Sequence, residues 1–240
     1  MSDPRGDLEA AFVGRRIVLI GAGALHSHGL LRGRMTEDLD FAIDVEVDEL
    51  IRVAQGIDGW SRSERMAQRW HTAEGGIVDL VPMGARHLAE GHVEWPDGAR
   101  MGLVGFRHLE APVASPAAVV LLKLVALDDR GLLRLKDLVD IAWLCDDYVG
   151  PTEDRAFEGP AADRGWFAEE GSAWTLGHDL GRLAAADDER ALVRRVLAEV
   201  LAPKGRWATR LAAHVPKSWG RDVDETRRRF GLLLDGFESA

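Results

Sequence analysis

Two aspartates, Asp38 and Asp40, stand two residues apart at the start of a β-prone segment that continues with Phe41-Ala42-Ile43. Because side chains alternate along a strand, both carboxylates are expected on the same face. Neighbouring carboxylates resist joint ionisation, and a divalent cation such as Mg²⁺ removes that conflict. A third carboxylate, Asp79, lies inside the apolar run 77–81, where an unpaired charge is costly. Together they predict a metal site for phosphoryl or nucleotidyl transfer, although Asp-x-Asp also occurs at solvated strand ends and helix caps.

The segment before these aspartates predicts a phosphate-binding turn. Residues 16–20 form an apolar strand pattern, and Gly21-Ala22-Gly23 reads as a tight turn that leads into a short helix. Glycines let backbone N–H groups approach a phosphate, and a helix N-terminus favours negative charge. The dinucleotide-binding fingerprint fails because His26 stands where its third glycine belongs.

These features resemble the nucleotidyltransferase superfamily typified by DNA polymerase beta. The fuller resemblance is to the AbiEii/MenT-like nucleotidyltransferases, the toxins of type IV toxin–antitoxin and abortive-infection systems. Residues 19–44, "LIGAGALHSHGLLRGRMTEDLDFAID", carry the first part of it. Residues 121–148 carry the second, with matching positions at Lys123, Asp129, Arg130, Lys136, Asp137, Asp140 and Ile141.

The resemblance implies transfer of a nucleoside monophosphate from an NTP to an acceptor hydroxyl. Mg²⁺ or Mn²⁺ would be held by Asp38 and Asp40, and Asp79 would complete a second metal position and help to deprotonate the acceptor. Asp137 is expected either to hold Lys123 or to contact the acceptor. The implied nucleotide-binding residues are Gly21, Gly23, Arg34, Thr36, Lys123 and Asp137. The implied acceptor is an RNA end, especially of tRNA, and the implied protein partner is an antitoxin.

The glycine turn departs from the family pattern, which has two adjacent glycines followed by Ser or Thr. Here Ala22 adds a Cβ, and no hydroxyl follows Gly23. Two alternatives therefore stay open beside the toxin reading. One is a nucleotidyltransferase with a small-molecule acceptor, as in antibiotic modification. The other is a non-catalytic nucleotide-binding or partner-binding module with the same fold.

Composition is that of an ordinary globular protein: 240 residues, 46% hydrophobic and 29% charged. The longest apolar run, 116–127, is interrupted by Lys123 and is too short to span a bilayer. The first residues lack an apolar signal region. The single cysteine, Cys145, excludes an intrachain disulfide and fits a reducing compartment. We expect a cytoplasmic protein without a membrane segment.

Charge is distributed unevenly along the chain. The net charge of −10 speaks against general nucleic-acid binding, but residues 190–229 hold eleven Lys/Arg and four Asp/Glu. This surplus is either a basic face for a phosphate-rich partner or a solvated helix surface.

The order of patterns predicts an α+β nucleotidyltransferase fold, with a small mixed β-sheet flanked by helices and a helical C-terminal region. A catalytic domain is expected over 1–148, a Gly/Pro-rich linker over 149–165 and a helical domain over 166–240. Strands are expected at 16–20, 38–44 and 101–107, with a hairpin formed by 68–72 and 76–82. Helices are expected at 7–13, 21–30, from 48, 116–130, 133–148, 176–186, 188–201, 205–214 and 222–237. His28 is expected to pack or anchor a loop at a helix end.

Overall fold

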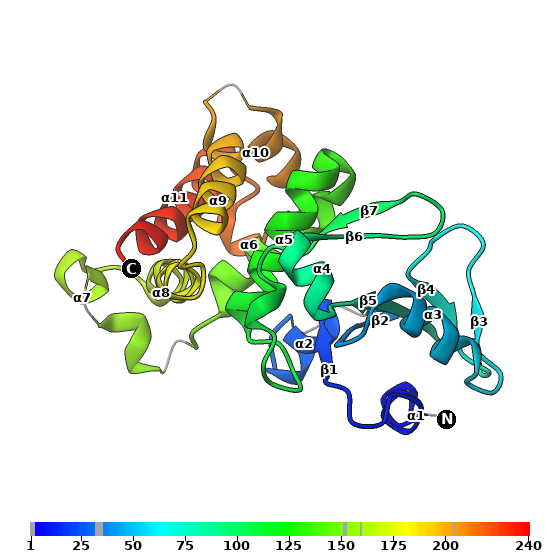
Figure 1. Cartoon of the computed structure of the whole chain (residues 1–240). Helices are drawn as coiled ribbons and strands as arrows, with labels where there is room; N and C mark the ends of the chain where they lie inside the picture. The colour runs from blue at the N-terminus through cyan, green and yellow to red at the C-terminus, as the bar shows by residue number, and fades with distance from the viewer. Residues whose placement is uncertain (1–2, 32–35, 151–152, 159, 204) are drawn as a thin grey trace. The chain divides into compact units, whose positions relative to one another are not determined.

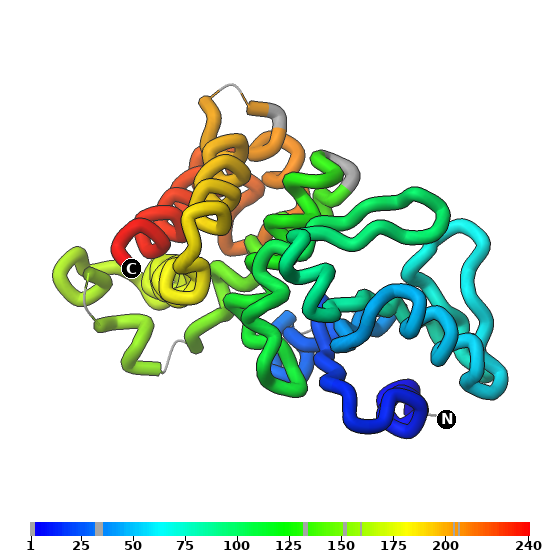
Figure 2. The backbone as a smooth tube through the Cα atoms, in the orientation of Figure 1, coloured from blue at the N-terminus to red at the C-terminus, as the bar shows by residue number. Residues whose placement is uncertain are grey.

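The protein, seen here as a computed structural model, is described over residues 3–31, 36–150, 153–158, 160–203 and 205–240. It divides into two compact units (Figures 1 and 2). The first comprises residues 1–28 and 33–115, and the second comprises residues 29–32 and 116–240. Within the described ranges, no helix combines the length and the apolar character that crossing a membrane requires.

The first unit is built on a mixed five-stranded sheet in the order β1-β2-β5-β4-β3. Strand β1 pairs antiparallel with β2, β2 pairs parallel with β5, and β5 and β3 each pair antiparallel with β4. The central strand β5 is almost wholly buried, as its continuous apolar run predicts. The bounds are β1 Ile17–Ile20, β2 Asp38–Ile43, β3 Ser61–Arg62, β4 Arg69–His71 and β5 Ile77–Pro82.

Helices and a small hairpin complete this unit (Figure 1). Helix α2 packs on β1 and β2, and α1 packs on α3. Asp3 caps α1 by accepting the N–H of Arg5 at 3.1 Å, and Pro4 starts the helix. The bounds are α1 Pro4–Ala11, α2 Gly21–Ser27, α3 Val47–Gln55, α4 Ala85–Glu90, β6 His92–Glu94 and β7 Arg100–Gly102. The strand expected over 101–107 is therefore shorter, because Gly105, at φ +84°, turns the chain into the 3₁₀ helix Phe106–His108.

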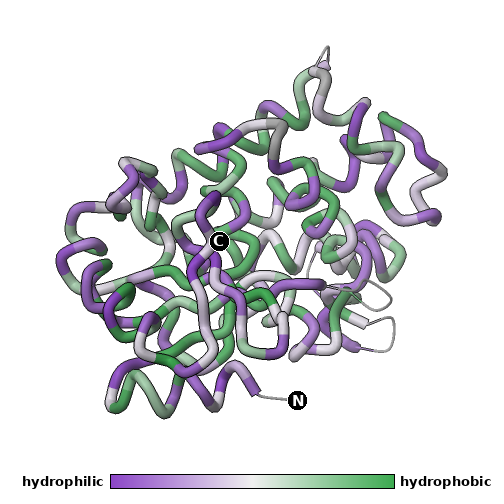
Figure 3. The backbone as a smooth tube through the Cα atoms, turned by 90° about the vertical axis from the view of Figure 1, so that its right-hand side faces the viewer, coloured by the Kyte–Doolittle hydropathy of each residue, from purple (hydrophilic) through white to green (hydrophobic). Residues whose placement is uncertain are grey.

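The second unit is helical throughout the part of the chain that is described (Figure 1). Hydrophilic and hydrophobic residues alternate along the chain (Figure 3), and most helices of this unit bury one face and expose the other. Its helices are α5 Pro116–Arg130, α6 Leu135–Asp147, α7 Pro160–Arg164, α8 Ala168–Leu183, α9 Asp187–Leu201, α10 Arg206–Leu211 and α11 Val223–Glu238.

Glycines allow α8 and α11 to cross closely. A Cβ added to Gly177 would overlap the carbonyl oxygen of Leu233, and one added to Gly236 would overlap that of Trp174. The contact buries Leu176, Leu180, Leu233 and Phe237 completely. Close approach of two backbones, rather than a turn, is thus the reason for glycine at these helical positions.

The expected α+β class, with its small mixed sheet flanked by helices and its helical C-terminal region, is confirmed. The division between units differs from the expected one. It falls at Ser115–Pro116 rather than at residue 148, because α5 and α6 pack against α8. The segment 149–165, expected as a linker, contains α7 and a 3₁₀ helix, Asp154–Phe157, whose Ala156 is fully buried.

Candidate functional site

The carboxylates of Asp38 and Asp79 converge on one arginine, Arg69. Nη2 of Arg69 donates to Oδ2 of Asp38 at 2.9 Å and to Oδ2 of Asp79 at 2.9 Å. Nε of Arg69 donates to Oδ1 of Asp79 at 2.8 Å, so that pair is bidentate. The Asp79 side chain is 11% exposed, and those of Asp38 and Arg69 are each 23% exposed. A single cationic nitrogen therefore bridges carboxylates from two neighbouring strands.

Sheet register lines these residues up. Asp40 of β2 pairs with Asp79 of β5, and Asp79 pairs in turn with Arg69 of β4. Directly opposed residues project to the same face of a sheet, so the three side chains share one face. Asp38, two residues before Asp40, belongs to that face as well. The alternation expected for Asp38 and Asp40 is thus present, and it is extended across three strands.

Asp40 lies against Gly21, the residue that follows β1. Gly21 has φ +63°, and a Cβ built on it would overlap the carboxylate of Asp40. Ile20, the residue before it, pairs with Asp40 across β1 and β2. Glycine is therefore required at this position for two reasons. Its backbone is left-handed, and the carboxylate of Asp40 occupies the space that a side chain would need.

Thr36 positions the first carboxylate. Its Oγ1 lies 3.0 Å from Oδ1 of Asp38 and 2.9 Å from the backbone oxygen of the same residue. Both carboxylate oxygens of Asp38 are thus engaged, one by Thr36 and the other by Arg69.

The surroundings of Arg69 favour its protonated, positively charged form. Its hydrogen bond to Asp79 raises its pKa, and the charges of Asp38 and Asp40 act in the same direction against the opposing effect of burial. A guanidinium does not deprotonate in proteins, so it leaves the carboxylates only by moving away.

The donor set fits a hard divalent cation. Carboxylate oxygens are the ligands that Mg²⁺ prefers, and those of Asp38 and Asp79 already meet at one cationic nitrogen. In the described ranges no three His, Cys, Asp or Glu side chains surround a common metal position. At this site the guanidinium of Arg69 stands between two of the three carboxylates. A metal would therefore have to take the place of Arg69.

The other residues expected near the phosphates have different surroundings. A Cβ on Gly23 would meet side-chain atoms of Leu39 at 3.2 Å and Leu19 at 3.3 Å, so this glycine serves the packing of α2 on the sheet. Arg34 lies outside the described residues. His28 places Nε2 3.0 Å from the carbonyl oxygen of Ala114, which is the loop-anchoring contact expected of it.

Lys123 and Asp137 form a second charged cluster, which belongs to the second unit. Nζ of Lys123 donates to Asp137 at 3.0 Å and to Asp140 at 2.7 Å, and Arg134 donates to Asp137 at 2.5 Å. All of these side chains except that of Arg134 are buried. Burial raises the pKa of Asp137, but the charges of Lys123 and Arg134 prevail and hold it below its usual value. Asp137 therefore does hold Lys123, one of its two expected roles.

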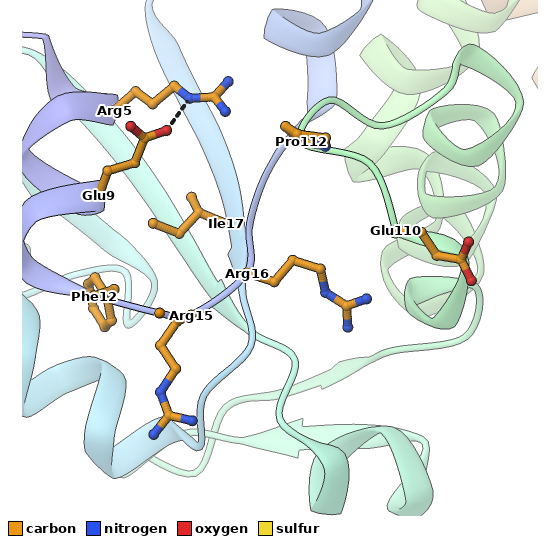
Figure 4. Close-up of a pocket in the computed structure, with 9 residues that line it drawn as sticks. Arg5, Glu9, Phe12, Arg15, Arg16, Ile17, Glu110 and Pro112 are labelled. Atoms are coloured by element: carbon orange, nitrogen blue, oxygen red, sulfur yellow. Dashed lines mark hydrogen bonds and ion pairs between the residues drawn. The ribbon is translucent and has the colours of Figure 1, made fainter.

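A surface pocket of the first unit lies apart from the carboxylates. Arg5, Glu9, Arg16 and Glu110 are among its lining residues (Figure 4). It also includes Ile17 at the start of β1, whereas Asp40 pairs with the last residue of that strand. None of the expected site residues lines this pocket.

The basic segment 190–229 is partly neutralised by ion pairs. Three of the acidic partners, Asp128, Glu170 and Glu238, come from outside it. The arginines engaged are Arg190, Arg194, Arg195, Arg227, Arg228 and Arg229. The local charge surplus therefore overstates the free positive charge of this surface.

Arg69 was not among the residues predicted from the sequence, although a signal for it exists. The hairpin expected over 68–72 and 76–82 has its turn at residues 74–76. The expected strands end at residue 72 and resume at residue 76, so pairing these inner ends places Arg69 opposite Asp79, which is the register observed. A basic residue facing a buried acid across a hairpin is a natural ion-pair partner.

No protein-family model matches this chain, and no curated protein matches it. Two solved structures resemble it. One is described as a "putative nucleotidyltransferase from H. pylori", with 19% identity, a TM-score of 0.40 and coverage of 100% of this chain and 98% of that one. The other, JHP933 from Helicobacter pylori, has 15% identity, a TM-score of 0.35 and coverage of 98% and 90%. These TM-scores are too low to carry an argument about the site. The function proposed below is therefore based on the geometry of this chain alone.

Proposed function

We propose that this protein is a divalent-metal-dependent nucleotidyltransferase that moves a nucleoside monophosphate from an NTP to an acceptor hydroxyl. The observation that carries the proposal is the convergence of Asp38 and Asp79, from adjacent parallel strands, on one cationic nitrogen, with Asp40 in register beside them. Three acidic side chains on one face of a sheet are a costly arrangement unless they serve to bind positive charge.

The roles of the residues follow from their chemistry. Bound Mg²⁺ or Mn²⁺ would neutralise the triphosphate and polarise the phosphoryl oxygens. Asp38, Asp40 and Asp79 would hold it, and Thr36 orients Asp38 for that purpose. Asp79 would accept the proton of the acceptor hydroxyl as its oxygen bonds to the α-phosphorus. The bond from that phosphorus to the bridging oxygen breaks, and pyrophosphate leaves with the electron pair.

The cationic and backbone groups would bind the nucleotide. The N–H groups at Gly21 and Gly23 and the side chain of Arg34 would compensate the phosphate charge. In the second unit, Asp137 holds Lys123, a further cation that the resemblance assigns to the nucleotide. We propose an RNA end, tRNA above all, as the acceptor, with the protein acting in the cytoplasm as a toxin controlled by an antitoxin.

A second candidate is a nucleotide-binding module without transferase activity. It is favoured by Arg69, which already supplies a cation to Asp38 and Asp79, and by the absence of a hydroxyl after Gly23. This candidate requires that nucleotides bind and that no transfer follows.

The test is transfer from each common NTP, labelled at the α-phosphate, to total cellular RNA with Mg²⁺ or Mn²⁺. The wild type is compared with Asp38→Asn and with Asp44→Asn. Asp44 follows β2, is 41% exposed and lies 3.6 Å from Arg16, so Asp44→Asn removes the same charge outside the site. We expect label on a discrete RNA with the wild type and Asp44→Asn, and none with Asp38→Asn.

Other outcomes separate the alternatives. Label on added small hydroxyl compounds but not on RNA would identify a small-molecule acceptor. Nucleotide binding by calorimetry, with no label on any acceptor, would favour the binding module. Equal labelling by the wild type and Asp38→Asn would overturn the assignment of the carboxylates.

A further inference from the structure

We propose that Arg69 is the resident counter-cation of the carboxylate site, that it excludes the divalent metal until a nucleotide arrives, and that it then transfers to the nucleotide's phosphates. The inference rests on the proposed function, since it concerns metal and nucleotide binding at that same site. It assigns to Arg69 a positioning role and makes the binding of metal and nucleotide interdependent.

The first support is that Arg69 occupies the atoms a metal would need. It engages both oxygens of Asp79 and Oδ2 of Asp38, and Thr36 engages the remaining oxygen of Asp38. Mg²⁺ binds oxygens at about 2.0–2.1 Å in a strict octahedron, which a guanidinium nitrogen in the same place prevents. Metal and Arg69 therefore compete for one position.

The second support is the way in which the backbone holds Arg69 in this place. Its pairing with Asp79 is set by the β4–β5 register, and the adjacent pair, Trp70 and Val78, is fully buried. The N–H of Arg69 donates to Met66 at 3.0 Å. Only the side chain is free to move, so the switch is a change of partner and not of fold.

The third support is the chemistry of the new partner. An arginine fork binds phosphate oxygens as readily as carboxylates. A metal that enters together with a triphosphate offers Arg69 a replacement anion, whereas a metal that enters alone leaves the guanidinium without one. Each ligand should therefore strengthen the binding of the other, because coupling between two ligands is reciprocal.

The test measures Mn²⁺ binding by the loss of the free-ion electron paramagnetic resonance signal, with and without a non-hydrolysable α,β-methylene NTP. Wild type, Arg69→Gln and Arg65→Gln are compared. Arg65 is an exposed arginine in the connection that leads from β3 to β4, so it is the matched charge control. Arg69→Lys is measured alongside, because it keeps the charge but loses the bidentate fork, and it serves if Arg69→Gln does not fold.

Without nucleotide, we expect Arg69→Gln to bind Mn²⁺ about tenfold more tightly than wild type, a factor typical of coupled sites. Arg65→Gln should match wild type, and Arg69→Lys should lie between wild type and Arg69→Gln. After correction for the Mn²⁺ that the analogue alone chelates, the NTP analogue should tighten Mn²⁺ binding more in wild type and Arg65→Gln than in Arg69→Gln. Equal or weaker Mn²⁺ binding by Arg69→Gln, or by Arg69→Lys if only that variant folds, would overturn the inference.

The two proposals fail in different ways. If wild type transfers nucleotides but the Arg69 variants bind Mn²⁺ no better, the transferase stands and the role of Arg69 is wrong. If Arg69→Gln binds Mn²⁺ more tightly and Asp79→Asn abolishes that binding, but no transfer occurs, the competition stands and the transferase is wrong. Absence of Mn²⁺ binding from all variants, with and without nucleotide, would overturn both.

Discussion

The two units of this protein use charge in opposite ways. In the first, Asp38, Asp40 and Asp79 share one face of a sheet, and the side chain of Arg69, which joins Asp38 to Asp79, is 23% exposed. In the second, charges are closely matched: Lys123 lies between two aspartates, and Arg134 joins one of them. A charged cluster that solvent can reach can exchange its cation for another, whereas a buried cluster of matched charges holds helices together.

Glycines also have different roles in the two units. Gly21 of the first unit makes room for a carboxylate, while Gly177 and Gly236 of the second make room for backbone carbonyls. The first kind of close approach positions a reactive group, and the second brings two helix axes together. Five predictions separate these roles, in order of decreasing effect.

The largest expected effect is on transfer activity. Asp79→Asn should lower it by at least about a thousandfold, the upper range seen when one charge-stabilising group is removed from an active site. Far-ultraviolet circular dichroism should stay native, because the amide can still accept a hydrogen bond from Arg69. Steady-state labelling with Asp44→Asn as control measures the effect. Turnover within a few-fold of wild type would mean that the acidic row is structural.

Removing the central cation of the second unit should cost stability. Lys123→Met leaves Asp137 and Asp140 buried beside a weaker set of cations, which is expected to destabilise the fold by about 3 kcal/mol. Urea denaturation at pH 7 measures it. A loss below about 1 kcal/mol would show that the cluster is not needed for the helices to pack, and would favour a role in ligand binding.

The same variant should change the pH dependence of stability. The folded-state pKa of Asp137 is lowered, so its contribution is present above its unfolded pKa, near 3.9, and is lost as the pH falls through its folded value. Without Lys123 the folded pKa rises toward the unfolded value, so the variant should lose less stability on acidification, and its deficit relative to wild type should shrink as the pH falls below about 4. Denaturation curves from pH 3 to 7 test this, and identical curves for both proteins would contradict it.

The helix crossing should be sensitive to one methyl group. Gly177→Ala or Gly236→Ala places a Cβ on a carbonyl oxygen and should destabilise the protein by about 1–3 kcal/mol through overpacking. Gly231→Ala in the same helix α11 meets nothing within 4 Å and should be neutral or stabilising by up to about 1 kcal/mol. Thermal unfolding of all three variants gives the comparison, and equal midpoints would refute the close crossing.

The smallest expected effect distinguishes backbone strain from a loss of metal binding. Gly21→Ala and Gly14→Ala both force a side chain into a left-handed backbone, at φ +63° and +74°, and should each cost about 1–2 kcal/mol. Only the first displaces Asp40, since a Cβ on Gly14 meets nothing within 4 Å. Mn²⁺ binding should therefore fall in Gly21→Ala alone. Equal Mn²⁺ binding by both variants would remove Asp40 from the site.

Local sequence patterns predict most of the secondary structure of this protein. The alternation of apolar residues and the positions of turn residues predict the strands, the helices and the hairpin, because local structure depends on neighbours along the chain. Helix α8 begins at Ala168, eight residues before its expected start, because its first half is buried by contacts with distant segments. The division at Ser115–Pro116 likewise depends on which helices α5 and α6 contact, and their own periodicity does not encode those contacts.

The sequence by itself determined that Asp38 and Asp40 share a face, that a glycine ends the first strand, and that an acid lies inside the run 77–81. Those features follow from a two-residue repeat and from the conformational freedom of glycine. Only the tertiary structure decided which cation meets the acids. Arg69 reaches Asp38 and Asp79 because β5 pairs with β2 on one side and with β4 on the other. Such registers join segments distant in the chain, and they are set by the packing of the whole sheet.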